Sequence, residues 1–256
     1  MIISRKRFLR IAGVSVVAAA GGKLAGTFGG AMQNAPLPSK SGLKPRRWAM
    51  AIDIDKCLQK EGCTKCIEAC HLNHNVPAIG GAHRVEWIWK APYNQAFPDD
   101  TNEYQYSRFR KAPVPLFCNH CDNPPCVRVC PTKATWKRED GVVMMDWHRC
   151  IGCRYCMAAC PYGSRSFNWT DPRPSIPNEN PDFPTRTKGV VEKCNLCEER
   201  LGRGELPLCV EACPQKAMIF GDLDDPDSTV REMLRSHYTI RRKPELGTNP
   251  QVYYIV

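Results

Sequence analysis

The sequence lacks an apolar segment long enough to cross a membrane near its start. Residues 11–20 form an apolar run about half as long as a bilayer requires. The chain also lacks a basic stripe with interleaved aromatic residues, so its formal net charge of +10 does not indicate nucleic-acid binding. No general base, nucleophile or substrate pocket is recognisable, which argues against an enzyme with its own active site. What the sequence has in abundance is cysteine, with 16 among 256 residues.

The cysteines from Cys150 to Cys160 have the spacing of a bacterial iron–sulfur motif. The run reads CIGCRYCMAACP, with two, two and three residues between successive cysteines and a proline after the last. Three thiolates this close together let one loop hold part of a 4Fe-4S cube. Cys160 lies a helical turn beyond Cys156 and points elsewhere. The motif therefore predicts one cluster at the loop and a second cluster that takes Cys160.

The same unit occurs four times along the chain, and the four units contain all 16 cysteines. The other units begin at Cys57, Cys118 and Cys194, and the last two also end in CxxxCP. The first unit is the least regular, because five residues separate Cys57 from Cys63 and a histidine replaces the proline. We therefore expect four 4Fe-4S clusters, of which the first is the one to differ in potential, lability or ligation.

The grouping of the ligands follows if the fourth cysteine of each unit crosses to the neighbouring cluster. The predicted inner groups are Cys118, Cys121, Cys126 and Cys160, and Cys150, Cys153, Cys156 and Cys130. The predicted outer groups are Cys57, Cys63, Cys66 and Cys213, and Cys194, Cys197, Cys209 and Cys70.

Two other uses of the cysteines agree less well with their spacing. Eight disulfides would suit an exported chain with an even cysteine count, but a disulfide framework gives no reason for CxxxCP to recur three times. Four zinc sites with four cysteine ligands each would place CxxC pairs far apart, whereas each run here holds three or four cysteines together. Iron–sulfur binding fits the spacing better than either.

Short strands are expected on both sides of the cysteine units. Entry strands are predicted at residues 48–54, 142–145 and 190–191, and exit strands at 134–136, 166–169 and 217–220. Strand, cluster loop, short helix and strand make half of a two-cluster ferredoxin module. The predicted fold is α+β and loop-rich, with two bacterial-ferredoxin-like modules. The inner module covers residues 115–170, residues 48–90 with 187–225 form the outer one, and residues 226–256 form a C-terminal extension.

The first 35 residues have the layout of a signal peptide. They hold five basic residues and no acidic one, and SRKRFLR precedes the apolar run. This start resembles a twin-arginine export signal in which Lys6 takes the place of the second arginine. Because clusters are built in the cytoplasm, such a chain would cross the membrane already folded. We expect a periplasmic or extracytoplasmic protein with a linker at residues 36–47; an uncleaved anchor is the alternative.

Two segments are not explained by cluster binding, residues 71–117 and 168–188. Aromatic residues in the first could anchor a partner protein or shield a cluster from water: Trp87, Trp89, Tyr93 and Phe97. Four histidines are expected to be hydrogen-bonding or plain loop residues, since the thiolate count is already complete: His71, His74, His120 and His148.

The positive charge is interpreted mainly as compensation for bound clusters. Five of the ten net positive charges lie in the first 35 residues, which leaves +5 for the remainder. A 4Fe-4S cluster with four thiolates carries about −2, so four would contribute about −8. The loaded mature chain would then be slightly acidic.

The chain resembles the four-cluster ferredoxin-like subunits of membrane oxidoreductases over essentially its whole length. The resemblance is carried by the following stretches: RWAMAID before Cys57, ACHLNHNVP from Ala69, CNHCDNPPCVRVCPTKAT from Cys118, MMDWHRCIGCRYCMAACPYGSRSFN from Met144, FPTRTKGVVEKCNLCEERL from Phe183, and the tail RRKPELGTNPQVYYIV. Within this family the chain is most similar to the iron–sulfur subunits of the Dsr membrane complexes of sulfur metabolism.

This resemblance implies a role in electron transfer. It implies an extracytoplasmic subunit docked on an integral membrane quinone-reactive subunit of the DsrP type, beside a multihaem cytochrome c of the DsrJ type. Two alternatives stay open. The chain could be the ferredoxin subunit of a molybdopterin reductase, such as a polysulfide or tetrathionate reductase, or it could contribute a catalytic cluster of its own. A missing cysteine would have favoured the last alternative.

Overall fold

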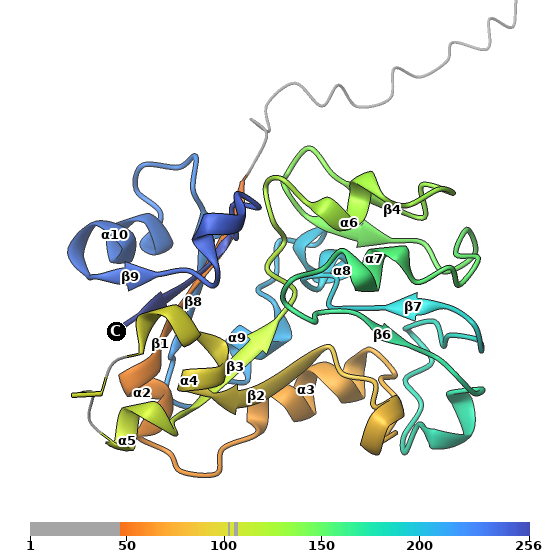
Figure 1. Ribbon diagram of the computed structural model, residues 1–256, viewed down its shortest axis with the longest axis horizontal. Helices are drawn as coiled ribbons and strands as arrows, with labels where there is room; N and C mark the ends of the chain where they lie inside the picture. The colour runs from red at the N-terminus through yellow and green to blue at the C-terminus, as the bar shows by residue number, and fades with distance from the viewer. Residues whose placement is uncertain (1–46, 102, 105–106) are drawn as a thin grey trace, which may run out of the picture. The chain divides into compact units, whose positions relative to one another are not determined.

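The computed structural model describes residues 47–101, 103–104 and 107–256 (Figure 1). The predicted signal peptide, and the predicted linker except residue 47, lie outside the described residues. The largest sheet in the described part has four strands in the order β8–β1–β10–β9. Their bounds are Met218–Asp222 for β8, Trp48–Asp53 for β1, Val252–Ile255 for β10 and Thr239–Ile240 for β9.

This sheet joins the two ends of the described chain. β1 runs antiparallel to β8, with Met50 opposite Phe220, and parallel to β10, with Met50 opposite Val252. Residues 226–256, which the sequence suggested as an extension, therefore supply strands β9 and β10 to the sheet that contains β1. They also form α10 (Thr229–Ser236), whose first turn is capped by the Ser228 hydroxyl.

The alternation of side chains along β1 divides the apolar core. Met50 and Ile52 point into the main core, whereas Ala49 and Ala51 point the opposite way and pack with Val230 of α10. Small residues let the helix lie close to the sheet. Gly221 of β8 has the same effect, since a Cβ atom there would lie 3.0 Å from the Val230 side chain.

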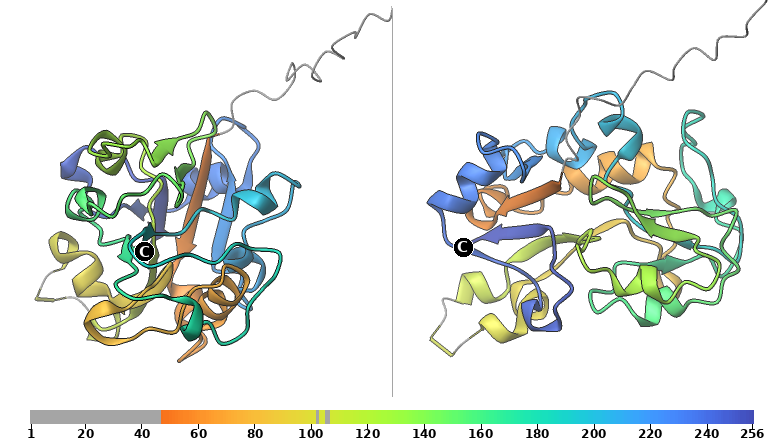
Figure 2. Two further views of the ribbon diagram at one scale, coloured as in Figure 1. Left: turned by 90° about the vertical axis from the view of Figure 1, so that its right-hand side faces the viewer. Right: turned by 90° about the horizontal axis from the view of Figure 1, so that it is seen from above.

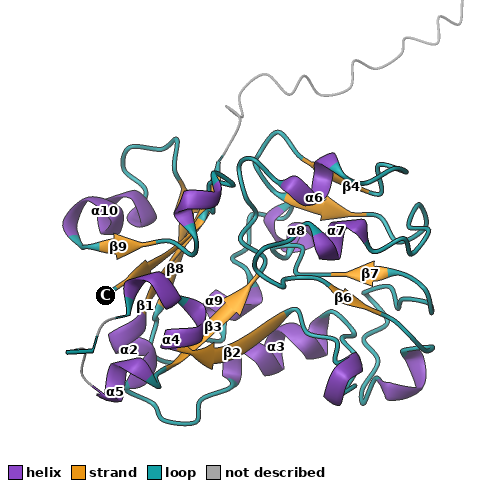
Figure 3. Ribbon diagram, viewed as in Figure 1, coloured by secondary structure: helices purple, strands orange, loops and turns teal. Residues whose placement is uncertain are grey.

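The other strands of the described residues form three two-stranded antiparallel sheets, and loops form most of the remaining described chain (Figure 3). The pairs are β2 (Ile88–Pro92) with β3 (Pro113–Phe117), β4 (Thr135–Lys137) with β5 (Val143–Met145), and β6 (Ser166–Phe167) with β7 (Val191–Glu192). The views in Figures 1 and 2 place β4, β6 and β7 on the opposite side from β9 and α10.

The helices are short. Four of them each carry the third cysteine of one unit. These four are α3 (Lys65–Asn73), α6 (Pro125–Arg128), α7 (Tyr155–Ala158) and α9 (Leu208–Glu211). Three of them, α6, α7 and α9, are single turns that end two residues before the fourth cysteine of their unit. Besides α10, the other α-helices of the described residues are α2 (Ile54–Leu58), α4 (Tyr93–Ala96), α5 (Ser107–Arg110) and α8 (Glu198–Leu201). No helix in the described ranges is long and apolar enough to span a membrane.

All six strands expected beside the cysteine units are present, with ends that differ by one or two residues. The mixed α and β content and the many loops also agree with the predicted class. The strands that the sequence did not suggest, β2, β3, β9 and β10, lie outside the cysteine units. The boundaries of the two modules stay a prediction, since one apolar core contains Met50, Val142 and Leu196 together.

The aromatic residues after the first unit are mostly core residues. Trp87, Tyr93 and Phe97 are buried, so the prediction that they anchor a partner is wrong for these three; Trp89 is half-buried, and for it the prediction stays open. Tyr93 and Phe97 pack against each other, and the Phe97 ring meets the Tyr254 ring of β10 edge to face. Trp87 instead lines a cavity that contains four cysteines.

Candidate metal centres

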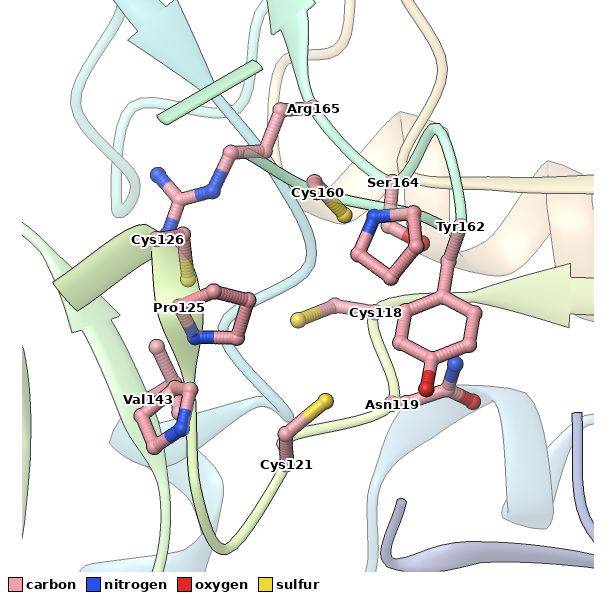
Figure 4. Close-up of a pocket in the computed structure, with 12 residues that line it drawn as sticks. Cys118, Asn119, Cys121, Pro125, Cys126, Val143, Cys160, Tyr162, Ser164 and Arg165 are labelled. Carbon is pink, nitrogen blue, oxygen red and sulfur yellow. The ribbon is translucent and has the colours of Figure 1, made fainter. Parts of the chain in front are cut away.

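Four cysteines from two different units surround one cavity beside α6. They are Cys118, Cys121, Cys126 and Cys160, and Figure 4 shows their sulfur atoms pointing into one common space. Pro125, Val143 and Tyr162 form part of the wall. The crossing of Cys160 from the third unit to the second is therefore a feature of the folded chain as well as of the motif.

Two more cavities are also lined by four cysteines each. One is lined by Cys70, Cys194, Cys197 and Cys209, with Trp87 and Phe117 in its wall. The other is lined by Cys57, Cys63, Cys66 and Cys213. In both, the last cysteine of one unit lies with the first three of another, as in the predicted groups.

The remaining four cysteines line none of these three cavities. Cys130, Cys150 and Cys156 pack in one apolar cluster with Val127 and Met157. Cys153 is the only cysteine in the chain whose side chain is exposed. We name the four groups by one member each: the Cys57 group, the Cys70 group, the Cys118 group and the Cys153 group. That they ligate clusters in these sets stays a prediction.

Burial changes the acidity of most of these thiols. It raises the pKa of Cys66 to about 11 and the pKa of Cys121 to about 12. Cys118 is an exception: burial opposes its ionisation, but His120 and Lys193 beside it hold its pKa well below the usual value. Neutral thiols therefore prevail in most groups without metal, so that cluster binding must displace protons.

Three cations lie beside the cysteine groups, and none was singled out from the sequence; Lys193 and Arg165 are buried, and Lys90 is half-buried. The Lys193 ammonium donates to the carbonyls of Val143 and Cys194, and only 1% of the residue is exposed. Arg165 lines the Cys118 cavity and donates to Thr135 Oγ1 at 2.9 Å. Lys90 lines the Cys57 cavity and donates to the Cys63 carbonyl at 2.6 Å.

Among the described residues, no carboxylate forms an ion pair with Lys193, Arg165 or Lys90. A buried charge without a counter-ion is costly, so these positions call for a nearby anion. A 4Fe-4S group with four thiolates carries about −2. Four sulfur donors line each cavity, and an unpaired cation lies in the walls of the Cys118 and Cys57 cavities, so both features fit such a group.

A buried ion pair supports the wall of the Cys70 cavity. The side chains of Arg186 and Glu192 are both fully buried, with Nη2 and Oε2 2.7 Å apart. Trp87 Nε1 donates to the same carboxylate at 2.7 Å, and Arg186 also donates to the carbonyls of His74 and Asn75. This network fixes the Trp87 ring and ties residues 183–188, which the sequence left unexplained, to the end of α3.

Three of the four histidines form hydrogen bonds through their rings, and His148 is an exposed loop residue, in line with the two roles expected of them. His74 is fully buried, with Nε2 2.9 Å from Glu199 Oε1 and Nδ1 2.8 Å from the Cys70 carbonyl oxygen. His120 Nδ1 accepts from the Val143 amide at 3.1 Å, and His71 Nε2 accepts from the Trp87 amide at 3.4 Å. The side chain of His148 is 95% exposed.

Comparison with known proteins identifies the chain more closely. Residues 110–223 match the model of the 4Fe-4S dicluster domain. The chain is 40% identical to "Hdr-like menaquinol oxidoreductase iron-sulfur subunit 1" of Archaeoglobus fulgidus, over 99% of this chain and 98% of the relative. It is 39% identical to the iron–sulfur cluster-binding subunit of menaquinone reductase from Nitratidesulfovibrio vulgaris, over 82% and 88%. It is 38% identical to a tetrathionate reductase subunit of Salmonella typhimurium, over 85% and 76%. This chain therefore belongs to the family of 4Fe-4S iron–sulfur subunits of oxidoreductase complexes.

Proposed function

We propose that this chain carries single electrons through four 4Fe-4S clusters between a membrane quinone-reactive subunit and a second redox partner. The observation that carries the proposal is the order of the four cysteine groups along the fold. Neighbouring groups share helices or contacts in a single series: the Cys57 group, the Cys70 group, the Cys118 group and the Cys153 group.

The two ends of this series are linked through shared helices. Cys66 and Cys70 lie four residues apart on α3, so α3 connects the Cys57 group with the Cys70 group. Cys156 lies on α7 and Cys160 two residues after it, so α7 connects the Cys153 group with the Cys118 group.

The middle of the series depends on Lys193. Its ammonium donates to the carbonyl of Val143, which lines the Cys118 cavity, and to the carbonyl of Cys194, which lines the Cys70 cavity. It also lowers the pKa of both the Cys118 and Cys194 thiols. The Cys70 group and the Cys118 group are thereby neighbours across a buried cation.

Exposure is greatest at the two ends of the series. Cys57 and Cys63 are half-buried and Cys153 is exposed. In the Cys118 group three of the four cysteines are buried. Electrons can therefore enter and leave at the outer groups while apolar side chains keep water from the inner ones.

When bound, each cluster would accept and release one electron at a potential set by its surroundings. The chain's own residues set those surroundings. Lys90, Arg165 and Lys193 place positive charge beside the cysteine groups, and Trp87 and Tyr162 fill the cavity walls. We assign the chain no substrate conversion of its own.

The proposed partners follow from the relatives and from the start of the chain. Relatives named for menaquinol oxidation and menaquinone reduction support a quinone-linked complex. We propose that the chain is a DsrO-type subunit, exported through its N-terminal signal and docked beside a DsrP-like membrane subunit and a DsrJ-like multihaem cytochrome c. The alternative, a subunit of a molybdopterin reductase, is about as well supported, since the relatives include one subunit each of a tetrathionate reductase and a polysulfide reductase.

Purification of the complex distinguishes the DsrO-type subunit from the molybdopterin reductase subunit. The tagged chain would be isolated without oxygen from detergent-solubilised membranes of its own host, and its partners identified by mass spectrometry and haem staining. A quinone-reactive membrane subunit with a multihaem cytochrome is the expected result. A large molybdenum protein would establish the alternative, and a chain that copurifies with no redox protein would contradict both.

A further inference from the structure

The loop around Cys153 exposes large apolar side chains beside the last cysteine group of the series. Ile151 is 67% exposed and Tyr155 is 64% exposed. Trp169, from the loop after β6, is 40% exposed and lies under the Arg154 guanidinium, 4.6 Å from its ring centre. We call these residues, with Cys153, the Cys153 surface.

The charged side chains around this surface are mostly basic. Asp146 is the only acidic residue between Gly141 and Thr170, and it faces the side chains of His148 and Arg149. Arg154 lies over the rings of Phe167 and Trp169 and forms no ion pair with a described carboxylate. Its charge is therefore available to a partner.

The backbone holds the Cys153 surface in one conformation. Gly152 has φ +70°, and a Cβ atom on it would lie 2.4 Å from the Gly189 carbonyl oxygen. Arg154 is itself in the left-handed region, with φ +62°. Because this loop is already fixed against the residues before β7, it loses little conformational entropy when a partner binds.

The opposite end of the series has a different surface. Around the Cys57 group, pairs of opposite charge lie at the surface, as in Lys56 with Asp53 and Lys65 with Glu68, and Lys90 is the unpaired cation there. Only the Cys153 end combines exposed apolar side chains, an exposed cysteine and arginines without an equal number of carboxylates.

We propose that the Cys153 surface is the docking site of a redox protein that presents acidic side chains around its own electron carrier. The proposal rests on the proposed function, since it takes the Cys153 group as one end of the electron path. Anionic lipid would also attract tyrosine, tryptophan and arginine. A redox protein is favoured because the exposed cysteine lies within the surface, and only an electron-carrying partner makes use of that position.

The test measures electron transfer to soluble haem proteins of opposite charge. Anaerobically purified full-length protein, reduced with dithionite and freed of excess reductant, would be mixed in a stopped-flow instrument with acidic cytochrome b5 or with basic cytochrome c. The variant is Tyr155→Glu. The matched control is Tyr238→Glu, because Tyr238 is 75% exposed and lies before β9.

At low ionic strength we expect Tyr155→Glu to lower the second-order rate constant with cytochrome b5 about tenfold, and Tyr238→Glu to leave it nearly unchanged. The wild-type rate should fall as salt is added, and the rate with cytochrome c should not fall. Equal rates for the two variants would overturn the proposal. The proposal would also be overturned if the wild type binds phosphatidylglycerol vesicles, Tyr155→Glu does not, and the two transfer electrons at the same rate. That result would assign the surface to lipid.

Two controls keep the outcomes separate. Iron content and absorbance near 400 nm are measured first for every protein, and a wild type without clusters would contradict the proposed function rather than the docking site. If Tyr155→Glu loses iron, Arg154→Gln replaces it, because the glutamine removes the charge and keeps the left-handed backbone. It should lower the rate with cytochrome b5 severalfold, and an unchanged rate would overturn the proposal.

Discussion

Replacing Lys193 with methionine should lower the reduction potentials of the two inner clusters. The ammonium is buried between the Cys70 and Cys118 groups, with two carbonyls as its acceptors and no described carboxylate in an ion pair with it. Reduction adds a negative charge to a cluster, and a nearby positive charge stabilises the reduced form. Methionine has a similar length and removes the charge, so the reduced form loses this stabilisation.

The size of the effect follows from Coulomb's law. Two unit charges about 6–8 Å apart interact by about 2–3 kcal/mol when the effective dielectric constant is about 20. For a one-electron step this equals about 100 mV, since about 59 mV corresponds to a tenfold change in the equilibrium constant. The outer groups are farther from Lys193, and their potentials should change less.

The assay is a redox titration followed by EPR at low temperature on wild type, Lys193→Met and Lys188→Met. Lys188 is exposed, so its charge is screened by solvent and its removal should leave all the potentials nearly unchanged. The reasoning is refuted if Lys193→Met raises the inner potentials, or if it shifts them no more than Lys188→Met does.

Three further predictions concern ligation and the fold. Cys153→Ser should remove one cluster and leave the others assembled, which iron analysis would detect as a loss of about four irons per chain; loss of all iron would contradict independent sites. Gly152→Ala should destabilise the protein by about 1–3 kcal/mol more than Gly163→Ala, because both glycines have positive φ but only the first lacks space for a Cβ atom. Thermal unfolding compares the two, and equal shifts would show that the loop adapts. Arg186→Met should cost about 3–5 kcal/mol in unfolding free energy, because it leaves the Glu192 carboxylate buried without its cation; a cost under about 1 kcal/mol would mean that water reaches the pair.

The predicted cysteine groups follow from the sequence because the motif has a local physical basis. Three cysteines in one loop and a fourth one turn further on can be recognised from spacing alone. The same spacing locates the short strands beside each unit, such as β1 and β8. Three of the four groups surround a cavity in the fold.

The residues that sequence reasoning missed depend on contacts between distant segments. Lys193 directly precedes Cys194, yet nothing in VEKCNLC distinguishes a buried lysine from an exposed one. Arg186 lies in a proline-containing loop and finds Glu192 only when that loop folds against α3. The C-terminal strand was missed for the same reason, because β10 pairs with β1, about 200 residues earlier in the chain.

The central claim, that this chain holds four clusters in one series, is tested most directly by iron and acid-labile sulfide analysis of anaerobically purified protein, combined with EPR after reduction. We expect about sixteen of each per chain and magnetically coupled 4Fe-4S signals. About twelve would mean that one site, first of all the Cys57 group, is empty or divergent. Zinc or disulfides in place of iron would contradict the account.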